Sequence, residues 1–219
     1  MDGRALTAAE LRDRLGAARI LLVVTEAACK GPWERAVERA LASGAVGVVQ
    51  LREKSCGDAE FLARARRLAA LARPAGALVT LNDRAHLVRE TDADGVHLGE
   101  DDLPPAQARA MLGPRPLIGI STHDEAEVAA ALGLGADYVG LGPCFTTQTK
   151  RLSRPPRGPD LVAACVHRTD LPVFPIGGIT AENAADLVRA GATRVAVGAG
   201  ILGADDPLRA ALRIRAALP

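Results

Sequence analysis

The stretch YVGLGPCFTTQTK, residues 138–150, changes character halfway along its length. Its first part, Tyr138 to Gly142, is short, apolar and glycine-bearing, which predicts a buried strand that other groups approach closely. Pro143 ends strand pairing, and the loop that follows carries threonine hydroxyls, an amide and the ammonium of Lys150. Donors of this kind at a strand end suit an anionic group such as a phosphate. A solvated surface loop is the alternative for this stretch taken alone.

Seven other short apolar segments alternate with helical patterns along the chain. With residues 138–141, the predicted strands cover residues 20–25, 46–51, 77–81, 95–98, 117–120, 173–176 and 195–197. The predicted helices cover residues 6–15, 32–42, 58–71, 84–89, 104–112, 124–132, 160–167 and 180–190, with a closing helix from Asp206 or Pro207. Strands that are apolar throughout are typical of parallel sheets covered on both faces.

This alternation predicts an α/β fold, a closed (βα)8 TIM barrel that forms a single domain over residues 1–219. A doubly wound open sheet is the alternative. It requires a glycine-rich turn after the first strand, and residues 25–30, TEAACK, contain no glycine. No Ser/Gly-rich or Pro-rich linker divides the chain, which favours one domain.

The composition disfavours several classes of partner. Lys and Arg number 27 against 26 acids, and aromatic residues make up 2%, so neither a nucleic-acid nor a membrane-surface role is expected. The cysteines, Cys29, Cys56, Cys144 and Cys165, have no CxxC spacing, which favours reduced thiols in a cytoplasmic protein over a zinc site or disulfides. No apolar run has the length of a signal peptide at the N-terminus or of a membrane span. A homo-oligomer is left open.

Polar side chains follow the second, third and fourth strands, where the active site of such a barrel lies. Arg52 and Lys54 stand two residues apart, so both can point inward and hold a diphosphate. A salt-bridged rim is an equal alternative for this pair. Asp83 and Asp102 follow adjacent strands, and two carboxylates so placed suit Mg²⁺ shared with phosphate oxygens. Each acid could instead cap the helix that follows it.

The later strand ends complete the pattern. Ser121 follows the fifth strand and is expected to face the barrel mouth, whereas His123 is expected to be a structural donor rather than a catalyst. Gly178 after the seventh strand and Gly198-Ala199 after the eighth are expected to form the phosphate-binding cup of this barrel. Two anion sites and a divalent metal indicate an enzyme that joins two phosphorylated small molecules and releases diphosphate.

Six segments resemble the thiamine-phosphate synthase family and occur in the family's order. They are QLREK at 50–54, LNDR at 81–84, GVHLGEDDLP at 95–104, GISTH at 119–123, YVGLGPCFTTQTK at 138–150 and PIGGIT at 175–180. The resemblance implies a (βα)8-barrel transferase of thiamine biosynthesis. Such an enzyme couples hydroxymethylpyrimidine diphosphate to hydroxyethylthiazole phosphate with Mg²⁺, giving thiamine phosphate and diphosphate.

The resemblance also implies a role for each matched residue. The pyrimidine diphosphate would bind at Gln50, Arg52, Lys54 and Asn82, with Leu51 and Glu53 inside the same substrate-binding segment. Asp83 and Asp102 would ligate Mg²⁺, and Ser121 and Lys150 would contact the departing diphosphate. The thiazole phosphate would bind at Thr147, Gln148, Thr149, Gly178, Gly198 and Ala199. Catalysis would rest on Lys150, Ser121, Arg52 and Lys54.

Two positions depart from the family pattern. Glu100 stands where the family usually has Gln, and Ala199-Gly200 replaces the usual Ser-Ala, which removes a hydroxyl from the phosphate cup. A related thiazole tautomerase would use the histidine of the STH segment and would not need the metal acids or TQTK. A catalytically idle, ligand-binding barrel should have lost one of these groups. Since both acids and TQTK are present, the synthase is the favoured interpretation.

Overall fold

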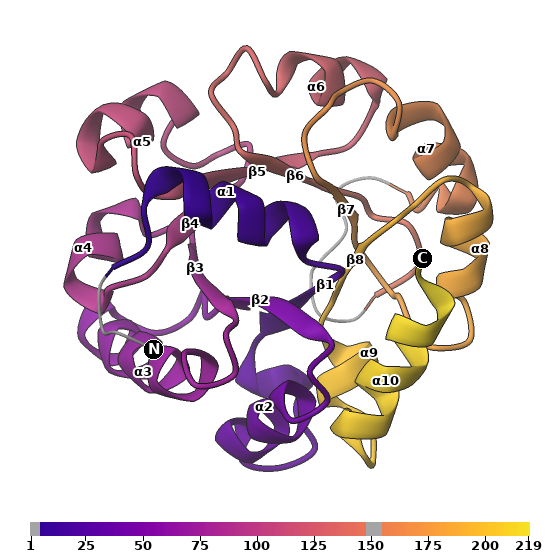
Figure 1. The fold of residues 1–219 in the computed structure, drawn as a ribbon, viewed down its shortest axis with the longest axis horizontal. Coiled ribbons are helices and arrows are strands. Elements are labelled where there is room, and N and C mark those ends of the chain that lie inside the picture. Colours follow the sequence, from indigo (N-terminus) through magenta and orange to yellow (C-terminus); the bar gives the residue numbers. More distant parts are fainter. Residues whose placement is uncertain (1–4, 148–154) are drawn as a thin grey trace.

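The computed structural model describes residues 5–147 and 155–219 and shows a barrel of parallel strands (Figure 1). The strands are β1 Ile20–Val24, β2 Val46–Leu51, β3 Leu78–Asn82, β4 Gly95–Leu98, β5 Leu117–Thr122, β6 Tyr138–Leu141, β7 Val173–Pro175 and β8 Val195–Val197. They pair in the order β7-β6-β5-β4-β3-β2-β1-β8. A parallel bridge between Ile176 and Ala196 joins the two ends of this sheet. The predicted TIM barrel is confirmed, and the doubly wound alternative is excluded.

Helices surround the strands as an outer ring (Figure 1). The α-helices are α1 Ala8–Ala17, α2 Trp33–Leu41, α3 Asp58–Ala72, α4 Val88–Thr91, α5 Pro105–Leu112, α6 Glu125–Ala130, α7 Gly158–Cys165, α8 Ala184–Arg189, α9 Ala199–Leu202 and α10 Pro207–Ala217, and the 3-10 helices are η1 Glu26–Ala28 and η2 Ala85–Leu87. Among the described helices, none is long and apolar enough to cross a membrane.

Helix α1 lies across one end of the barrel instead of joining the ring (Figure 1). A capping box between Thr7 and Glu10 fixes its start. Its buried Leu11 and Leu15 belong to an inner apolar cluster with side chains from the barrel interior. Arg12 Nε is 2.8 Å from Oδ1 of Asp137, the residue before β6, so α1 covers the amino ends of the strands. The carboxyl ends stay open for a functional site.

The alternation of each strand divides the apolar residues between two cores. On β1, Leu21 and Val23 pack in the inner cluster, whereas Ile20, Leu22 and Val24 pack in the outer cluster beneath the helices. The side-chain period of two in a strand produces this division. Both cores consist of buried, closely packed residues, so they hold the strand ends in a rigid frame.

Some helix starts and caps differ from those expected from the sequence. Helix α3 begins at Asp58, as the predicted range 58–71 does, but Gly57 occupies its N-cap position and no side chain caps it. Arg84 precedes η2 and Pro104 precedes α5, so neither Asp83 nor Asp102 serves as a helix cap. The predicted helix over 180–190 begins only at Ala184, after Asn183. Because these acids do not cap helices, their carboxylates are directed to other contacts.

Other helix starts match the sequence. Asp124, the first residue of the predicted helix over 124–132, caps α6: its Oδ1 accepts a hydrogen bond from the Glu127 N–H at 2.9 Å. Asp206 caps α10, with Pro207 in the first helical position. The short helix α9 was not predicted, because its four residues follow directly from a strand end rich in glycine.

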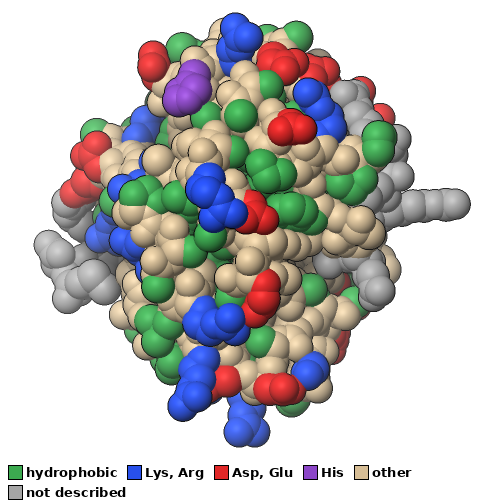
Figure 2. All heavy atoms as spheres, turned by 90° about the vertical axis from the view of Figure 1, so that its right-hand side faces the viewer, with side chains coloured by type: hydrophobic (Ala, Val, Ile, Leu, Met, Phe, Trp, Pro, Cys, Tyr) green, Lys and Arg blue, Asp and Glu red, His purple; other side chains and the backbone are tan. Residues whose placement is uncertain are grey.

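The surface carries no broad patch of one charge on the side of α7, α8 and α10. On this face, basic and acidic side chains are interspersed with apolar ones (Figure 2). This pattern agrees with the near-zero net charge of the sequence, a formal +1.

Candidate active site

A cavity of about 440 Å³ opens among the carboxyl ends of the strands. Predicted site residues that line it are Gln50, Arg52, Lys54, Asn82, Asp83, Ser121, Thr147, Gly178, Gly198 and Ala199. The predicted residues Gln148, Thr149 and Lys150 lie outside the residues that the structure describes. Residues far apart in the chain therefore meet in one place, as the barrel topology requires.

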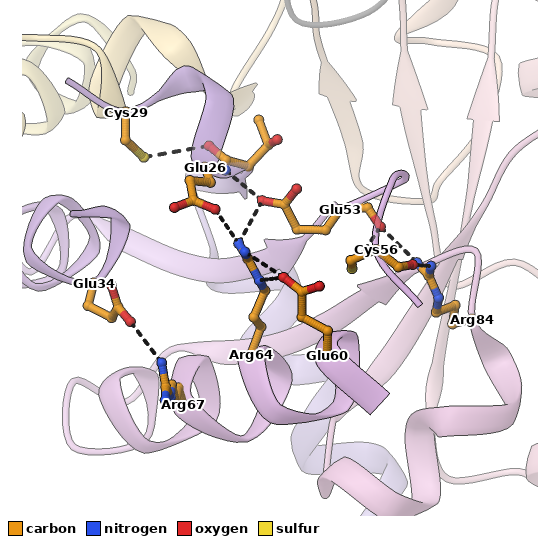
Figure 3. Close-up of polar contacts among 10 residues, drawn as sticks. Glu26, Cys29, Glu34, Glu53, Cys56, Glu60, Arg64, Arg67 and Arg84 are labelled. Atoms are coloured by element: carbon orange, nitrogen blue, oxygen red, sulfur yellow. Dashed lines mark hydrogen bonds and ion pairs between the residues drawn. The ribbon is translucent and has the colours of Figure 1, made fainter. Parts of the chain in front are cut away.

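The last residues of β2 and the loop that follows it send alternate side chains to opposite sides. Gln50, Arg52 and Lys54 line the cavity. Leu51 is buried in the outer core, and the Glu53 carboxylate accepts a hydrogen bond from the Glu26 N–H at 2.5 Å, away from the cavity (Figure 3). The predicted inward orientation of the two cations is therefore observed. The side chains of Leu51 and Glu53 do not line the cavity.

Two amides form part of the cavity wall between β2 and β3. Gln50 Nε2 donates a hydrogen bond to Asn82 Oδ1 at 3.2 Å, and both side chains are buried. Beside them, burial lowers the pKa of Arg52, whereas the nearby Asp83 and Glu53 raise it. A cation and amides in this setting can hold phosphate oxygens by charge-assisted hydrogen bonds.

The two predicted metal acids lie side by side. Lys54 Nζ is 3.0 Å from Asp83 Oδ2, and the Gly99 N–H donates to Asp102 Oδ2 at 2.6 Å. Burial raises the pKa of Asp102, and the neighbouring Asp83 carboxyl raises it further, whereas the Gly99 N–H and Lys54 lower it. The structure therefore brings together acids from two strand ends, although Asp102 itself does not line the cavity.

This acid pair fits Mg²⁺. Among the described residues, no group of three or more His, Cys, Asp or Glu side chains could hold a metal. Mg²⁺ is commonly bound by one or two carboxylates, with substrate phosphates and water as its other ligands. Two adjacent carboxyls repel each other when both are ionised, and a bound cation would relieve that repulsion. Asp83 and Asp102 would hold the ion.

The cavity is also lined by glycine-bearing segments that follow β7 and β8. Gly178 has a φ of +62°, and a Cβ there would lie 2.3 Å from the carbonyl oxygen of Thr146. Asn183 holds this turn, because its Nδ2 donates to Gly178 O at 2.9 Å and its Oδ1 accepts from Thr180 N at 2.8 Å. Gly198 directly precedes α9 and also lines the cavity. Close backbone and a helix start are features that a phosphate cup of this barrel requires, and phosphate binding by Gly178, Gly198 and Ala199 stays a prediction.

The sequence did not identify His97 as a cavity residue. His97 on β4 has Nε2 3.1 Å from Ser121 Oγ and Nδ1 3.3 Å from the Tyr138 hydroxyl. Burial raises the pKa of Tyr138, so its hydroxyl stays protonated. A histidine at an inward position of an apolar strand, GVHL, was the available signal. His123 also lines the cavity, with Nδ1 3.0 Å from Glu127 Oε2.

A closed barrel with charged residues and a cavity at the carboxyl ends of its strands defines a (βα)8-barrel enzyme. The family model described as thiamine monophosphate synthase matches residues 20–201. The chain belongs to the thiamine monophosphate synthase family.

Named relatives agree over most of the chain. A thiamine-phosphate synthase of Gloeobacter violaceus is 45% identical over 203 residues, which cover 93% of this chain and 58% of that protein. The thiamine-phosphate synthase of Chloroflexus aurantiacus is 42% identical over 197 residues, which cover 90% of this chain and 91% of that protein. The chain thus spans little more than half of the first relative and nearly all of the second.

Solved structures give the same picture. The thiamine phosphate pyrophosphorylase from Pyrococcus furiosus is 29% identical with a TM-score of 0.82, over 94% of this chain and 96% of that one. A 3-hexulose-6-phosphate synthase from Salmonella typhimurium, 18% identical with a TM-score of 0.65 over 91% of this chain and 98% of that one, shares the fold alone.

Proposed function

We propose that the chain acts as a thiamine-phosphate synthase. It would condense 4-amino-2-methyl-5-(diphosphooxymethyl)pyrimidine with hydroxyethylthiazole phosphate and release thiamine phosphate and diphosphate. The observation that carries this proposal is one cavity with two unlike walls. One wall presents Arg52, Lys54 and Asp83, with Asp102 beside Asp83, and the other presents glycine backbone. Family membership and relatives with this name support the same reaction.

The charged wall would bind the diphosphate. Arg52 and Lys54 face the cavity and would neutralise its oxygens, while Gln50 and Asn82 would accept or donate hydrogen bonds beside them. Mg²⁺ held by the acid pair would supply further positive charge to the leaving group. Ser121 would donate a hydrogen bond to the departing diphosphate. Lys150, outside the described residues, is assigned the same task by its place in the family motif.

The backbone wall would bind the thiazole phosphate. Gly178, Gly198 and Ala199 offer main-chain groups, and Thr147 lies on the same cavity. Gln148 and Thr149 would complete this side. At Gly200, a Cβ would lie 2.1 Å from the Ile179 carbonyl oxygen, so the usual Ala would not fit this backbone without a shift.

Orientation would do most of the work in the carbon–nitrogen bond formation. Departure of diphosphate leaves the pyrimidine methylene electron-poor, and the thiazole nitrogen can attack it without a general base. Holding the two reactants in line replaces a bimolecular encounter by a step within one complex. Positive charge aimed at the leaving oxygens lowers the barrier further. This reaction needs no side-chain nucleophile.

A direct assay tests the proposal. The protein is mixed with both phosphorylated precursors, with Mg²⁺ or with a chelator, and thiamine phosphate is read by mass. We expect product only with both substrates and Mg²⁺. Isomerisation of the thiazole alone, without coupling, would instead establish the tautomerase, which His123 at the cavity would serve. If neither product forms, the interpretation that remains is a catalytically idle, ligand-binding barrel. A cytoplasmic location and a homo-oligomer stay predictions.

A further inference from the structure

The loop that carries the cavity's two cations has little backbone support of its own. It runs over residues 52–57, between β2 and α3. Arg52 N donates to Val24 O at 2.8 Å, but within the part of the chain that the structure describes, no backbone group of residues 53–56 pairs with another backbone group. Polar backbone that lacks such partners is held by side chains or water. The side chains that hold this loop therefore decide where Lys54 lies.

Arg84 holds the loop at two carbonyls (Figure 3). Its Nη1 donates to Glu53 O at 2.8 Å, and its Nη2 donates to Cys56 O at 2.6 Å. The guanidinium lies over the Phe61 ring, 4.2 Å from the centroid, and the side chain is only 17% exposed. A planar group with several fixed donors, packed on an aromatic ring, can fix two carbonyls in one geometry.

The position of Arg84 in the sequence couples this loop to the metal acids. Arg84 directly follows Asp83, whose backbone φ is +65° and whose carboxylate meets Lys54 at 3.0 Å. The end of β3 thus contacts the loop twice. The Asp83 carboxylate pairs with Lys54, and the Arg84 guanidinium donates to the carbonyls on either side of Lys54. Any shift of Arg84 would change the distance between Lys54 and Asp83.

A second contact to the loop is weaker. Arg64 Nη1 is 3.7 Å from Glu53 Oε1, and the same guanidinium is shared with Glu26 and Glu60 at 2.7 Å each (Figure 3). The carboxylates of Glu26 and Glu60 are more than half exposed, and exposed ion pairs contribute little. Arg64 thus contacts only the Glu53 side chain of the loop, whereas Arg84 holds the loop backbone.

We propose that Arg84 is a positioning residue for the diphosphate wall of the cavity. It does not line the cavity. It acts by holding the loop so that Arg52 and Lys54 meet the diphosphate beside Asp83. The proposal deepens the proposed function and rests on it for the identity of the ligand. The loop geometry itself does not depend on which reaction the cavity performs.

The test compares four variants with the wild type. Arg84→Gln removes the guanidinium, and Arg84→Lys keeps the charge but cannot span both carbonyls. Asp58→Asn weakens the third contact of Arg84, from Nε to Asp58 Oδ1 at 3.0 Å, and leaves the carbonyl contacts in place. Arg89→Gln is the matched control, since Arg89 Nη2 also donates to a carbonyl, that of Met111 at 2.9 Å, far from the loop.

Calorimetry with inorganic diphosphate and Mg²⁺ gives the affinity, and amide hydrogen exchange reports on residues 53–57. Arg84→Gln should weaken diphosphate binding about tenfold, the size of one lost charge-assisted hydrogen bond, and speed exchange in the loop. Arg84→Lys should fall between that variant and the wild type. Binding of hydroxyethylthiazole phosphate should stay unchanged in all four variants. In Asp58→Asn and Arg89→Gln, the diphosphate affinity and the exchange rate of the loop should also stay at the wild-type values.

The outcomes separate this proposal from the proposed function. If Arg84→Gln keeps the diphosphate affinity and the loop exchange rate of the wild type, the positioning role is overturned. The role is also overturned if Asp58→Asn loses as much diphosphate affinity as Arg84→Gln, or if Arg84→Gln weakens both ligands equally. If Arg84→Gln does not fold, Arg84→Lys decides by the same two readouts. If the wild type makes no thiamine phosphate, faster loop exchange with weaker diphosphate binding still supports Arg84. A synthase with normal kinetics in Arg84→Gln would leave the function standing and overturn the role of Arg84.

Discussion

The two walls of the cavity differ in the means by which they meet an anion. At the ends of β2 to β4, side chains with formal charges converge, with Lys54 3.0 Å from Asp83 and Asp102 beside it. At the ends of β7 and β8, glycine turns leave the backbone uncovered, with Gly178 too close to Thr146 to carry a Cβ. The first wall should respond to metal and charge. The second should respond to any added side-chain atom.

Loss of either metal acid should have the largest effect. Asp83→Ala and Asp102→Ala are each expected to abolish Mg²⁺-dependent turnover, because one carboxylate alone would not hold the ion. Folding should survive, since both residues lie at the functional face and outside the apolar cores. Asp101→Ala is the matched control, because Asp101 is exposed and adjacent in sequence. Turnover near the wild-type rate in either variant at limiting Mg²⁺ would remove the metal assignment.

Loss of the Lys150 ammonium should have the second-largest effect on turnover. If it neutralises diphosphate only as that group departs, its contribution is made in the transition state. Lys150→Ala should then lower kcat by roughly 10²–10³-fold and leave substrate binding nearly intact. Lys150→Arg should rescue only in part, because a planar fork does not reproduce a compact ammonium. Steady-state kinetics measure both parameters, and an unaltered kcat in the alanine variant would contradict this role.

A methyl group added to the backbone wall should weaken one ligand and spare the other. Gly178→Ala places a Cβ 2.3 Å from Thr146 O at a φ of +62°, and we expect about tenfold weaker binding of hydroxyethylthiazole phosphate, with diphosphate binding unchanged. Gly44→Ala controls for backbone strain, because Gly44 has a φ of +67° with open space around it. Gly44→Ala should lower the free energy of unfolding by about 1 kcal/mol and leave the affinity for both ligands unchanged. Equal losses for both ligands in Gly178→Ala would mean that the two walls are not separate.

Glu100 should have the smallest effect. Its side chain is exposed, although the sequence places it two residues before a metal acid. Glu100→Gln should change the Mg²⁺ requirement or the apparent diphosphate affinity by at most about 1 kcal/mol, the range of a charge in an exposed setting. Mg²⁺ titrations of the two proteins measure this. Superimposed curves would show that Glu100 does not act on the site, and a much larger shift would show that it belongs to it.

The local patterns were enough to predict the barrel and, together with the family resemblance, part of the cavity wall. Apolar segments such as residues 46–51 identify buried parallel strands, and the chemistry of a barrel gathers at the ends of these strands. The alternation of side chains then places Arg52 and Lys54 inward. The resemblance placed Leu51 and Glu53 in the same segment, but alternation turns their side chains away from the cavity.

The missed residues act through contacts between distant parts of the chain. Arg84 stands in the matched segment LNDR, but no local pattern assigns it a role, and only the fold brings it to the carbonyls of Glu53 and Cys56. His97 meets Ser121 and Tyr138 from other strands in the same way. The local cap signals of Asp83 and Asp102 were misleading, because Asp83 pairs with Lys54 and Asp102 accepts from the Gly99 N–H instead.

Metal dependence of binding tests the two-walled cavity most directly. Calorimetric titrations of the wild type with inorganic diphosphate and, separately, with hydroxyethylthiazole phosphate are run with Mg²⁺ and with a chelator. Removal of Mg²⁺ should weaken diphosphate binding by about tenfold or more, because the acid pair then repels the ligand, and should leave the thiazole phosphate affinity unchanged. Equal metal dependence of both ligands, or metal dependence of the thiazole phosphate alone, would contradict the assignment of charge to one wall and backbone to the other.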